Sequence, residues 1–132
     1  MKAIVLAAGE GKRLRPLTYG IPKPLLPVGG RPVIEYVMDN IQKCKEIDTV
    51  SVAVSHMRAA LESYLSHVSY RGVRVEPVTT LGWETGGDLK AVLLQNEIRD
   101  EPVLVCYGDN VTTLDTRKLL DAHRKNEGGG TC

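Results

Sequence analysis

A basic, glycine-rich segment between residues 9 and 34 holds the side chains best suited to chemistry. It opens with Gly9-Glu10-Gly11-Lys12-Arg13, directly after an apolar run of strand length. Glycines let backbone N–H groups approach phosphate oxygens, and basic side chains supply compensating charge. The segment has one acid, Glu10, and five basic residues: Lys12, Arg13, Arg15, Lys23 and Arg31. The segment therefore predicts a local anion site.

Two familiar phosphate-binding motifs do not fit this segment. A dinucleotide-binding G-x-G-x-x-G loop needs a third glycine where Leu14 stands, and the prolines that follow prevent an immediate helix. A P-loop needs a glycine at Leu6 and a Ser or Thr at Arg13. An anion site here must therefore follow another pattern.

The elements that position this segment alternate between strands and helices. Continuous apolar runs of strand length occur at residues 3–8, 50–54 and 103–107, and 73–75 is a shorter copy. Continuous hydrophobicity is typical of strands covered on both faces, as in a parallel sheet. Apolar residues at helical spacing predict helices within 33–44, 61–68, 89–93 and 115–126. We expect an α/β fold with three layers, α/β/α, around a mainly parallel sheet.

Composition excludes several other classes of protein. The chain has 132 residues, 42% hydrophobic and 25% charged, with a net charge of +1. These values exclude a disordered chain, a coiled coil and collagen, and leave no overall field to hold nucleic acid or an anionic membrane. The apolar run at residues 3–8 is too short to span a bilayer. Three widely spaced cysteines, Cys44, Cys106 and Cys132, suit reduced thiols, so we expect a cytoplasmic protein.

One long string and two short motifs resemble a single enzyme family. The string runs from Leu6-Ala7-Ala8-Gly9 to Thr18 and continues from Pro22-Lys23-Pro24 to Pro32. It resembles the signature of the sugar-1-phosphate nucleotidyltransferases, also called NDP-sugar pyrophosphorylases. Glu84-Thr85-Gly86-Gly87 looks like the family's base-recognition loop, and Tyr107-Gly108-Asp109-Asn110 looks like its metal-binding turn. The resemblance covers essentially the whole chain and implies a Rossmann-like nucleotidyltransferase domain.

The resemblance implies transfer of a nucleotidyl group from a nucleoside triphosphate to a sugar 1-phosphate, with release of pyrophosphate and with Mg²⁺ as cofactor. The sugar phosphate is already an anionic nucleophile, so catalysis consists of positioning and charge neutralisation. By this resemblance Arg13 binds the leaving phosphates, Lys23 binds the α-phosphate and sugar phosphate, and Asp109 binds the metal. The further substrate contacts that it implies are Leu6, Ala7, Ala8, Gly9, Gly11, Thr85, Gly86, Tyr107 and Gly108.

Other readings of these residues stay open at this stage. Asp109 also suits a simple turn, and the segment from Glu84 also suits the start of a helix. Lys12, Arg15 and Arg31 are expected to be salt-bridge partners or electrostatic background. The histidines lack metal-ligand spacing, so we expect them at the surface or partly packed, and we expect Trp83 to pack against protein rather than ligand.

The sequence also leaves alternatives for the identity of the base and the sugar and for the activity of the protein. The loop at 83–86 departs from the family's usual Leu-Gly-Thr-Ala, which leaves the base open, although Gly108-Asp109-Asn110 leans toward the glucose-1-phosphate thymidylyltransferases. A nucleotide-sugar-binding regulatory domain that has lost catalysis is the second reading. A dinucleotide-dependent oxidoreductase is a distant third.

The end of the chain carries a further expectation. The helix before Gly128 should return the chain to the sheet, yet only Thr131 and Cys132 follow as the first residues of a strand. Family members are considerably longer, and a later carboxylate completes their metal site. We therefore expect residues 1–132 to be the nucleotide-binding N-terminal part of a longer domain, inactive alone. The strand ending at Tyr107 should then have an open apolar edge, which favours aggregation or pairing with another copy in a homo-oligomer.

Overall fold

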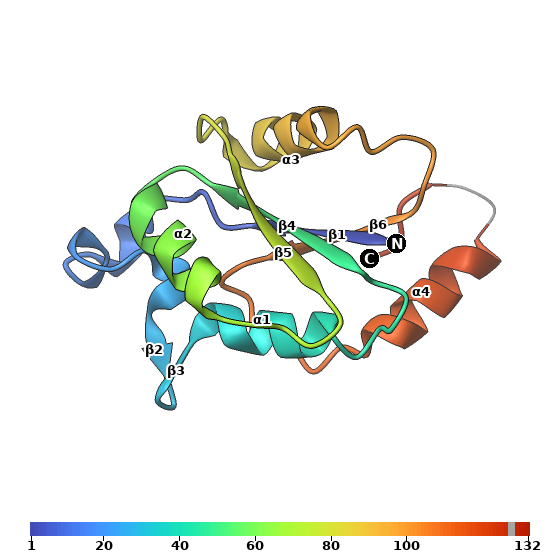
Figure 1. Ribbon diagram of the computed structural model, residues 1–132, viewed down its shortest axis with the longest axis horizontal. Coiled ribbons are helices and arrows are strands. Elements are labelled where there is room, and N and C mark those ends of the chain that lie inside the picture. Colours follow the sequence, from blue (N-terminus) through green and yellow to red (C-terminus); the bar gives the residue numbers. More distant parts are fainter. Residues whose placement is uncertain (127–128) are drawn as a thin grey trace.

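The computed structural model describes residues 1–126 and 129–132, and its centre is a parallel sheet (Figure 1). The sheet contains β1 (Lys2–Leu6), β4 (Thr49–Val54), β5 (Arg74–Thr79) and β6 (Val103–Tyr107), in the order β5-β4-β1-β6. The first strand thus lies between the second apolar run and the strand ending at Tyr107, an order that right-handed crossovers allow. A small antiparallel hairpin, β2 (Pro27–Val28) and β3 (Arg31–Pro32), stands outside this sheet.

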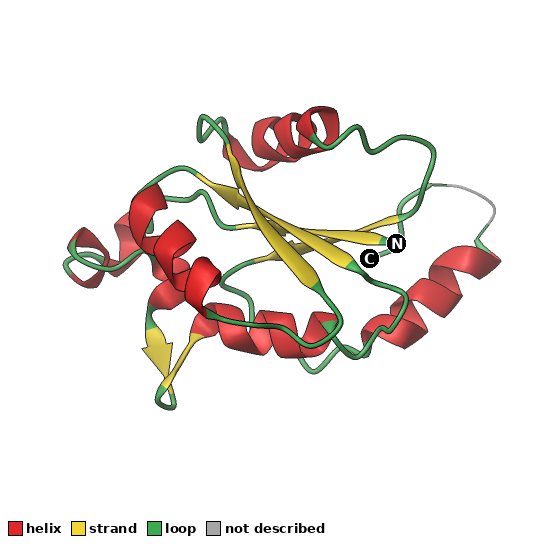
Figure 2. Ribbon diagram, in the orientation of Figure 1, coloured by secondary structure: helices red, strands yellow, loops and turns green. Residues whose placement is uncertain are grey.

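Helices cover both faces of the sheet (Figure 2). The described ranges contain α1 (Val33–Ile41), α2 (Arg58–His67), α3 (Glu84–Gln95) and α4 (Thr116–Lys125). Helix α3 lies on one face, and the other three helices lie on the opposite face. Asp115 accepts the N–H of Arg117 and so caps α4 at its predicted start. The predicted three-layer α/β/α architecture with a mainly parallel sheet is confirmed.

Two aliphatic clusters on opposite sides of the sheet form the core. Successive side chains of a strand point to opposite faces, so Val5 packs in the cluster with α1 while Ile4 packs in the cluster with Val92 of α3. Strand β4 is buried along its whole length. Burial on both faces accounts for the continuous apolar runs, and in the absence of Phe the core consists mainly of Val, Ile, Leu, Ala and Met, with Cys44 and Tyr70.

The two edges of the sheet differ in how they are protected. Pro77 lies within β5, opposite Val52, which an edge strand tolerates because its outer side needs no ladder hydrogen bond. On the other side, β6 pairs within the described residues with β1 alone, and Val105 and Tyr107 are exposed. The open edge predicted for the strand ending at Tyr107 is therefore present.

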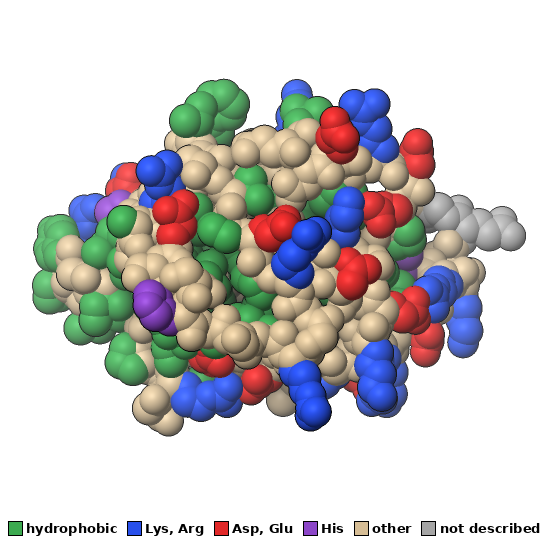
Figure 3. Space-filling model, in the orientation of Figure 1, with side chains coloured by type: hydrophobic (Ala, Val, Ile, Leu, Met, Phe, Trp, Pro, Cys, Tyr) green, Lys and Arg blue, Asp and Glu red, His purple; other side chains and the backbone are tan. Residues whose placement is uncertain are grey.

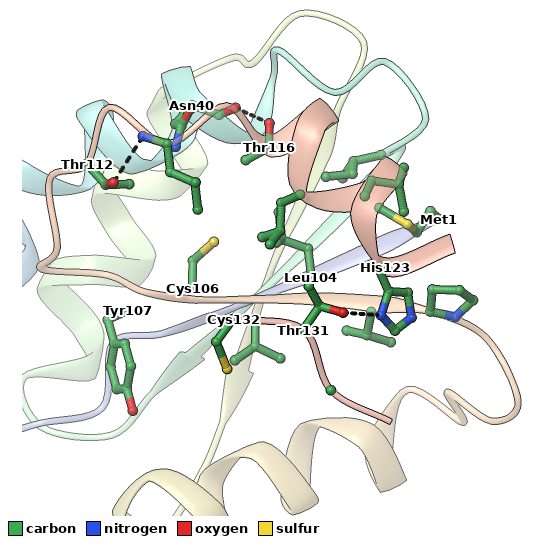
Figure 4. A pocket seen from close by; sticks show the side chains of 18 of the residues that line it. Met1, Asn40, Leu104, Cys106, Tyr107, Thr112, Thr116, His123, Thr131 and Cys132 are labelled. Carbon is green, nitrogen blue, oxygen red and sulfur yellow. Dashed lines mark hydrogen bonds between the residues drawn. The ribbon is translucent and has the colours of Figure 1, made fainter. Parts of the chain in front are cut away.

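A groove of about 1260 Å³ runs along the open edge of β6, between that strand and α4 (Figure 4). Leu104 and Cys106 line it from the strand, and Leu120 lines it from the helix. Thr131 and Cys132 also line this groove and belong to no strand, so the strand expected to start there is not observed. Helix α4 ends at Lys125, before the glycines at 128–130, of which Gly128 lies outside the described residues.

The surface carries no large region of one charge on the face that Figure 3 shows, where basic and acidic side chains are interspersed. Hydrophobic side chains gather at the left end of this view, where the segment after β1 projects from the fold. That segment exposes Leu17 and Tyr19. No helix in the described part of the chain is long and apolar enough to cross a membrane.

Candidate functional site

The carboxyl ends of three neighbouring strands meet at one edge of the sheet. Leu6, the last residue of β1, pairs with Ala53 on one side and with Tyr107 on the other. A cavity of about 850 Å³ opens there, and Gly9 and Asp109 both line it. Ligands of open α/β sheets bind at this kind of edge, where the strand order reverses. Gly9 and Asp109 therefore lie at the same end of the sheet, as expected for residues that follow neighbouring parallel strands.

Glycine is suited to the two positions that open the loop after β1, 9 and 11, for different structural reasons. Gly11 has φ +64°, and a Cβ there would lie 2.8 Å from the Cγ2 of Thr18. The Thr18 hydroxyl also donates to the Gly11 carbonyl at 2.8 Å, which fixes the loop conformation. A Cβ on Gly9 would meet nothing within 4 Å, and Gly9 lines the cavity. Gly11 therefore shapes the loop, whereas Gly9 leaves room for a ligand to approach the backbone.

Two basic side chains of the loop share ion pairs with one carboxylate. Glu10 pairs with Lys12 at 3.2 Å and with Arg15 at 3.4 Å. The Arg15 guanidinium also lies over the Tyr19 ring, 5.1 Å from its centroid. Arg13 makes no ion pair or hydrogen bond with any described residue, and it lines the cavity. Arg13 is therefore the loop cation whose hydrogen-bond donors remain available to an anion.

The remaining basic residues behave as the sequence suggests. Arg31 pairs with Asp39 at 2.8 Å and with Glu35 at 3.7 Å, close to the β2–β3 hairpin rather than in the cavity. Together with Lys12 and Arg15, it agrees with the expectation of salt-bridge partners.

Lys23 and Asp109, which both line the cavity, form an ion pair. Lys23 stands between Pro22 and Pro24, which are both buried and hold the backbone beneath it. Asp109 follows β6 on a turn in which the Gly108 N–H donates to the Leu6 carbonyl at 2.9 Å. The side chains of Lys23 and Asp109 are 37% and 29% exposed, so both remain accessible to a ligand.

The donor set available to a metal ion is small. No group of three His, Cys, Asp or Glu side chains within residues 1–126 and 129–132 could hold an ion. Asp109 nevertheless supplies carboxylate oxygens beside the cations of the cavity. Protein-bound Mg²⁺ is often held by one or two carboxylates together with substrate phosphates. Asp109 fits such a site when the substrate supplies the other oxygens.

The first turn of α3 forms another part of the cavity wall. Thr85 and Glu84 line the cavity from this turn, and both are exposed. A Cβ on Gly87 would lie 2.6 Å from the Cβ of Trp83, so Trp83 requires glycine at that position. The Trp83 side chain is otherwise 67% exposed and does not line the cavity, so the expected packing is limited to its base.

Most of the predicted site residues line this one cavity. They are Leu6, Ala8, Gly9, Gly11, Arg13, Lys23, Thr85, Tyr107 and Asp109. Ala7, Gly86 and Gly108 do not line it. Ala7 and Gly108 are buried against each other, and a Cβ on Gly108 would lie 3.1 Å from that of Ala7. These two residues therefore hold β1 and β6 together, and their place in the predicted substrate contacts has no support from the cavity.

Several lining residues were not anticipated as site residues: Ser55, His56, Leu81, Gly82 and Asp88. His56 is half-buried in the cavity wall, which its lack of metal-ligand spacing did not suggest. Ser55 and His56 directly follow β4, the neighbour of β1. Their position directly after an apolar run could have identified them, because residues that follow parallel strands lie at the same edge of the sheet.

Comparison with known proteins places the whole chain in one family. Residues 2–132 match the model of the family described as nucleotidyl transferase. The chain is 36% identical to a mannose-1-phosphate guanylyltransferase of Mycobacterium tuberculosis and 31% identical to a UTP–glucose-1-phosphate uridylyltransferase of Synechocystis sp.. These alignments cover 94% and 95% of this chain, respectively, and 34% of each relative.

A solved structure supports the same assignment. The putative glucose-1-phosphate thymidylyltransferase from Bacillus anthracis superposes with a TM-score of 0.79 at 26% identity, covering 98% of this chain and 52% of that one. The chain thus spans about a third of the length of the two curated relatives and about half of this structure. With its fold, its motifs and the match over nearly its whole length in agreement, the chain belongs to the nucleotidyl transferase family.

Proposed function

We propose that the protein transfers a nucleotidyl group from a nucleoside triphosphate to a sugar 1-phosphate and releases pyrophosphate. The observation that carries this proposal is the convergence of Arg13, Lys23 and Asp109 on one cavity at the carboxyl edge of the sheet. The relatives are named for reactions of this class with glucose 1-phosphate and mannose 1-phosphate. The regulatory and oxidoreductase readings have no observation in their favour.

The reaction needs no proton transfer at its centre. An oxygen of the sugar phosphate attacks the α-phosphorus and forms a new oxygen–phosphorus bond. The bond between the α-phosphorus and the oxygen that bridges it to the β-phosphate breaks. The negative charge of the nucleophile is transferred to the departing pyrophosphate. Catalysis then depends on holding the reactants in line and neutralising charge on their oxygens.

Two cations of the cavity, Arg13 and Lys23, have roles suited to their chemistry. The planar fork of Arg13 suits the β- and γ-phosphates that leave together. The ammonium of Lys23, held on a backbone fixed by two prolines, suits the α-phosphate and the incoming sugar phosphate. Asp109 would hold Mg²⁺, which when bound neutralises phosphate oxygens.

The ion pair of Lys23 with Asp109 gives the ligand-free site a defined starting state. The ammonium is neutralised by the carboxylate before substrate arrives. Both groups must exchange this partner for new ones, Lys23 for a phosphate and Asp109 for the metal. Binding of metal and binding of phosphate are therefore coupled through the same pair.

The proposal extends to the place of this chain in a larger protein. We propose that residues 1–132 are the nucleotide-binding N-terminal part of a nucleotidyltransferase domain that acts in the cytoplasm. The share of each relative that the chain spans and the open groove along β6 support this proposal. Association of two copies through the β6 edge is the alternative means of covering that groove.

Replacement of Arg13 tests the proposed function. Arg13→Ala should lower the rate of pyrophosphate release by the full-length protein by about a hundredfold or more, the range found for loss of one transition-state hydrogen-bond donor. Thermal stability should change little, because an exposed, unpaired arginine carries little folding energy. Arg99→Ala, which removes an exposed arginine outside the cavity, is the matched control. An Arg13→Ala protein with the wild-type rate would contradict the assignment.

A further inference from the structure

Asp88 is a buried acid whose structural role uses only part of its hydrogen-bonding capacity. Its side chain lines the cavity from α3, and the residue is 6% exposed. One carboxylate oxygen, Oδ1, accepts the N–H of Trp83 at 3.2 Å. Asp88 forms no ion pair, and its Oδ2 accepts no hydrogen bond from any described residue. Because Asp88 lines the cavity and Oδ2 is not enclosed by protein, this oxygen can accept a hydrogen bond from a donor on a ligand.

The distribution of charge in the cavity indicates which part of a nucleotide lies near Asp88. The cations Lys12, Arg13 and Lys23 come from the loop after β1, and the acids on that side, Glu10 and Asp109, pair with Lys12 and Lys23. Glu84 and Asp88 come from α3 and form no ion pair with any described residue. A triphosphate held by the cations would be repelled by these two unpaired acids of α3. The nucleoside end of the ligand must therefore lie toward α3.

The chemistry of the carboxylate then distinguishes among the bases. An ionised Asp only accepts hydrogen bonds. Guanine has two adjacent donors on one edge, N1–H and the exocyclic N2 amine. Adenine and cytosine each place a ring acceptor beside the amine, and uracil and thymine flank their single N3–H with two carbonyl oxygens. Guanine is therefore the base whose edge matches a carboxylate at both positions.

We propose that Asp88 contacts the base and selects guanine, so that the nucleotide substrate is GTP. This inference rests on the proposed function, because it needs a nucleoside triphosphate in the cavity. The carboxylate would accept N1–H and the N2 amine while Oδ1 keeps its contact with the Trp83 N–H. Asp88 would then read the base and also hold the start of α3.

Binding of triphosphates by calorimetry tests the inference, with GTP, ITP, XTP, UTP, dTTP, CTP and ATP as probes. ITP lacks the N2 amine, and XTP has a carbonyl oxygen in its place. The wild-type protein should bind GTP more tightly than each of the others by about fivefold to a hundredfold, the discrimination expected for one bidentate base contact. Asp88→Asn should reverse the preference and bind XTP more tightly than GTP, because the amide donates to O2 of xanthine and accepts from N1–H.

Two controls separate recognition from structure. Asp121→Asn changes an exposed acid on α4 and should leave every affinity unchanged. Glu84→Gln changes the other acid of the same wall and should not favour XTP. A melting curve for each variant confirms that it is folded.

The outcomes distinguish the inference from the proposed function. Equal binding of all triphosphates by the wild type overturns the selection of guanine and leaves the proposed function standing. An equal loss for every triphosphate in Asp88→Asn also overturns it, because it indicates a ribose contact or a purely structural role. A preference for XTP in Glu84→Gln but not in Asp88→Asn assigns the base to Glu84 instead. Failure of every triphosphate to bind overturns the proposed function and the inference together.

Discussion

Replacement of Asp109 by Asn should strengthen the binding of a triphosphate in the absence of metal, although it removes a residue assigned to the site. The ligand-free site holds Lys23 in an ion pair with Asp109. A phosphate can bind Lys23 only after the ion pair with Asp109 breaks, and the Asp109 carboxylate also repels the phosphate. Asp109→Asn frees the ammonium and removes the repulsion, so the cost of opening the pair disappears.

The size of this gain follows from the exposure of the pair. At about 4 Å and an effective dielectric of about 20, two unit charges attract by about 4 kcal/mol. Both side chains are about one third exposed, and hydration returns most of that energy, so the net value is about 1 kcal/mol. Since 1.4 kcal/mol is a factor of ten, metal-free triphosphate should bind about fivefold more tightly to Asp109→Asn.

Calorimetric titration in EDTA and then in Mg²⁺ measures both parts of the effect. The wild type should gain affinity when Mg²⁺ is added, whereas Asp109→Asn should gain little. In a Lys23→Met background, Asp109→Asn should gain less in EDTA than it does in the wild-type background, because no ammonium is released. Weaker metal-free binding by Asp109→Asn, or an equal gain with and without Lys23, would refute the reasoning.

Further predictions follow from local features of the structure. Gly9→Ala should fold normally yet weaken triphosphate binding. Gly11→Ala should lower the melting temperature, because alanine disfavours the left-handed φ of position 11 and its Cβ would approach Thr18. Cys132, which is exposed, should react with a thiol reagent at pH 8 much faster than Cys106, because burial raises the pKa of the Cys106 thiol to about 11; equal rates would contradict the groove geometry. The hydrogen bonds from the Thr49 hydroxyl and from the N-terminal amine lower the pKa of Asp48 below its ordinary value of 3.8. The ionised Asp48 carboxylate therefore stabilises the fold above about pH 4, and this stabilisation is lost as the pH falls through the pKa of the folded state. Asp48→Asn should therefore flatten the melting temperature between pH 5 and pH 3, and an unchanged slope would contradict this assignment.

The fold was predictable from sequence because its signals are local and repeated. Strands buried on both faces, such as β4, require runs without polar interruption, and such runs are visible in the sequence. Strand order then follows from the handedness of crossovers and the family resemblance. Strand β5 was underestimated at residues 73–75, because its exposed and charged positions break the apolar run and it contains Pro77.

The site was predictable only in part, because several of its residues are far apart in the chain and only the fold brings them together. Gly9, Arg13 and Lys23 belong to one contiguous string, so the sequence groups them. Asp88 was missed because an acid in the first turns of a helix is ordinarily a cap, and only the fold shows it to be buried in the cavity wall. The ion pair of Lys23 with Asp109 joins residues far apart in the chain, and no spacing rule predicts it.

The most direct test of the proposed function is release of pyrophosphate by the full-length protein, measured by a coupled assay with each common nucleoside triphosphate and a panel of hexose 1-phosphates. We expect pyrophosphate release that requires both substrates and Mg²⁺ and that falls by orders of magnitude in Arg13→Ala and Lys23→Ala. Triphosphate binding without pyrophosphate release for any pair of substrates would contradict nucleotidyl transfer and favour a regulatory nucleotide-binding domain.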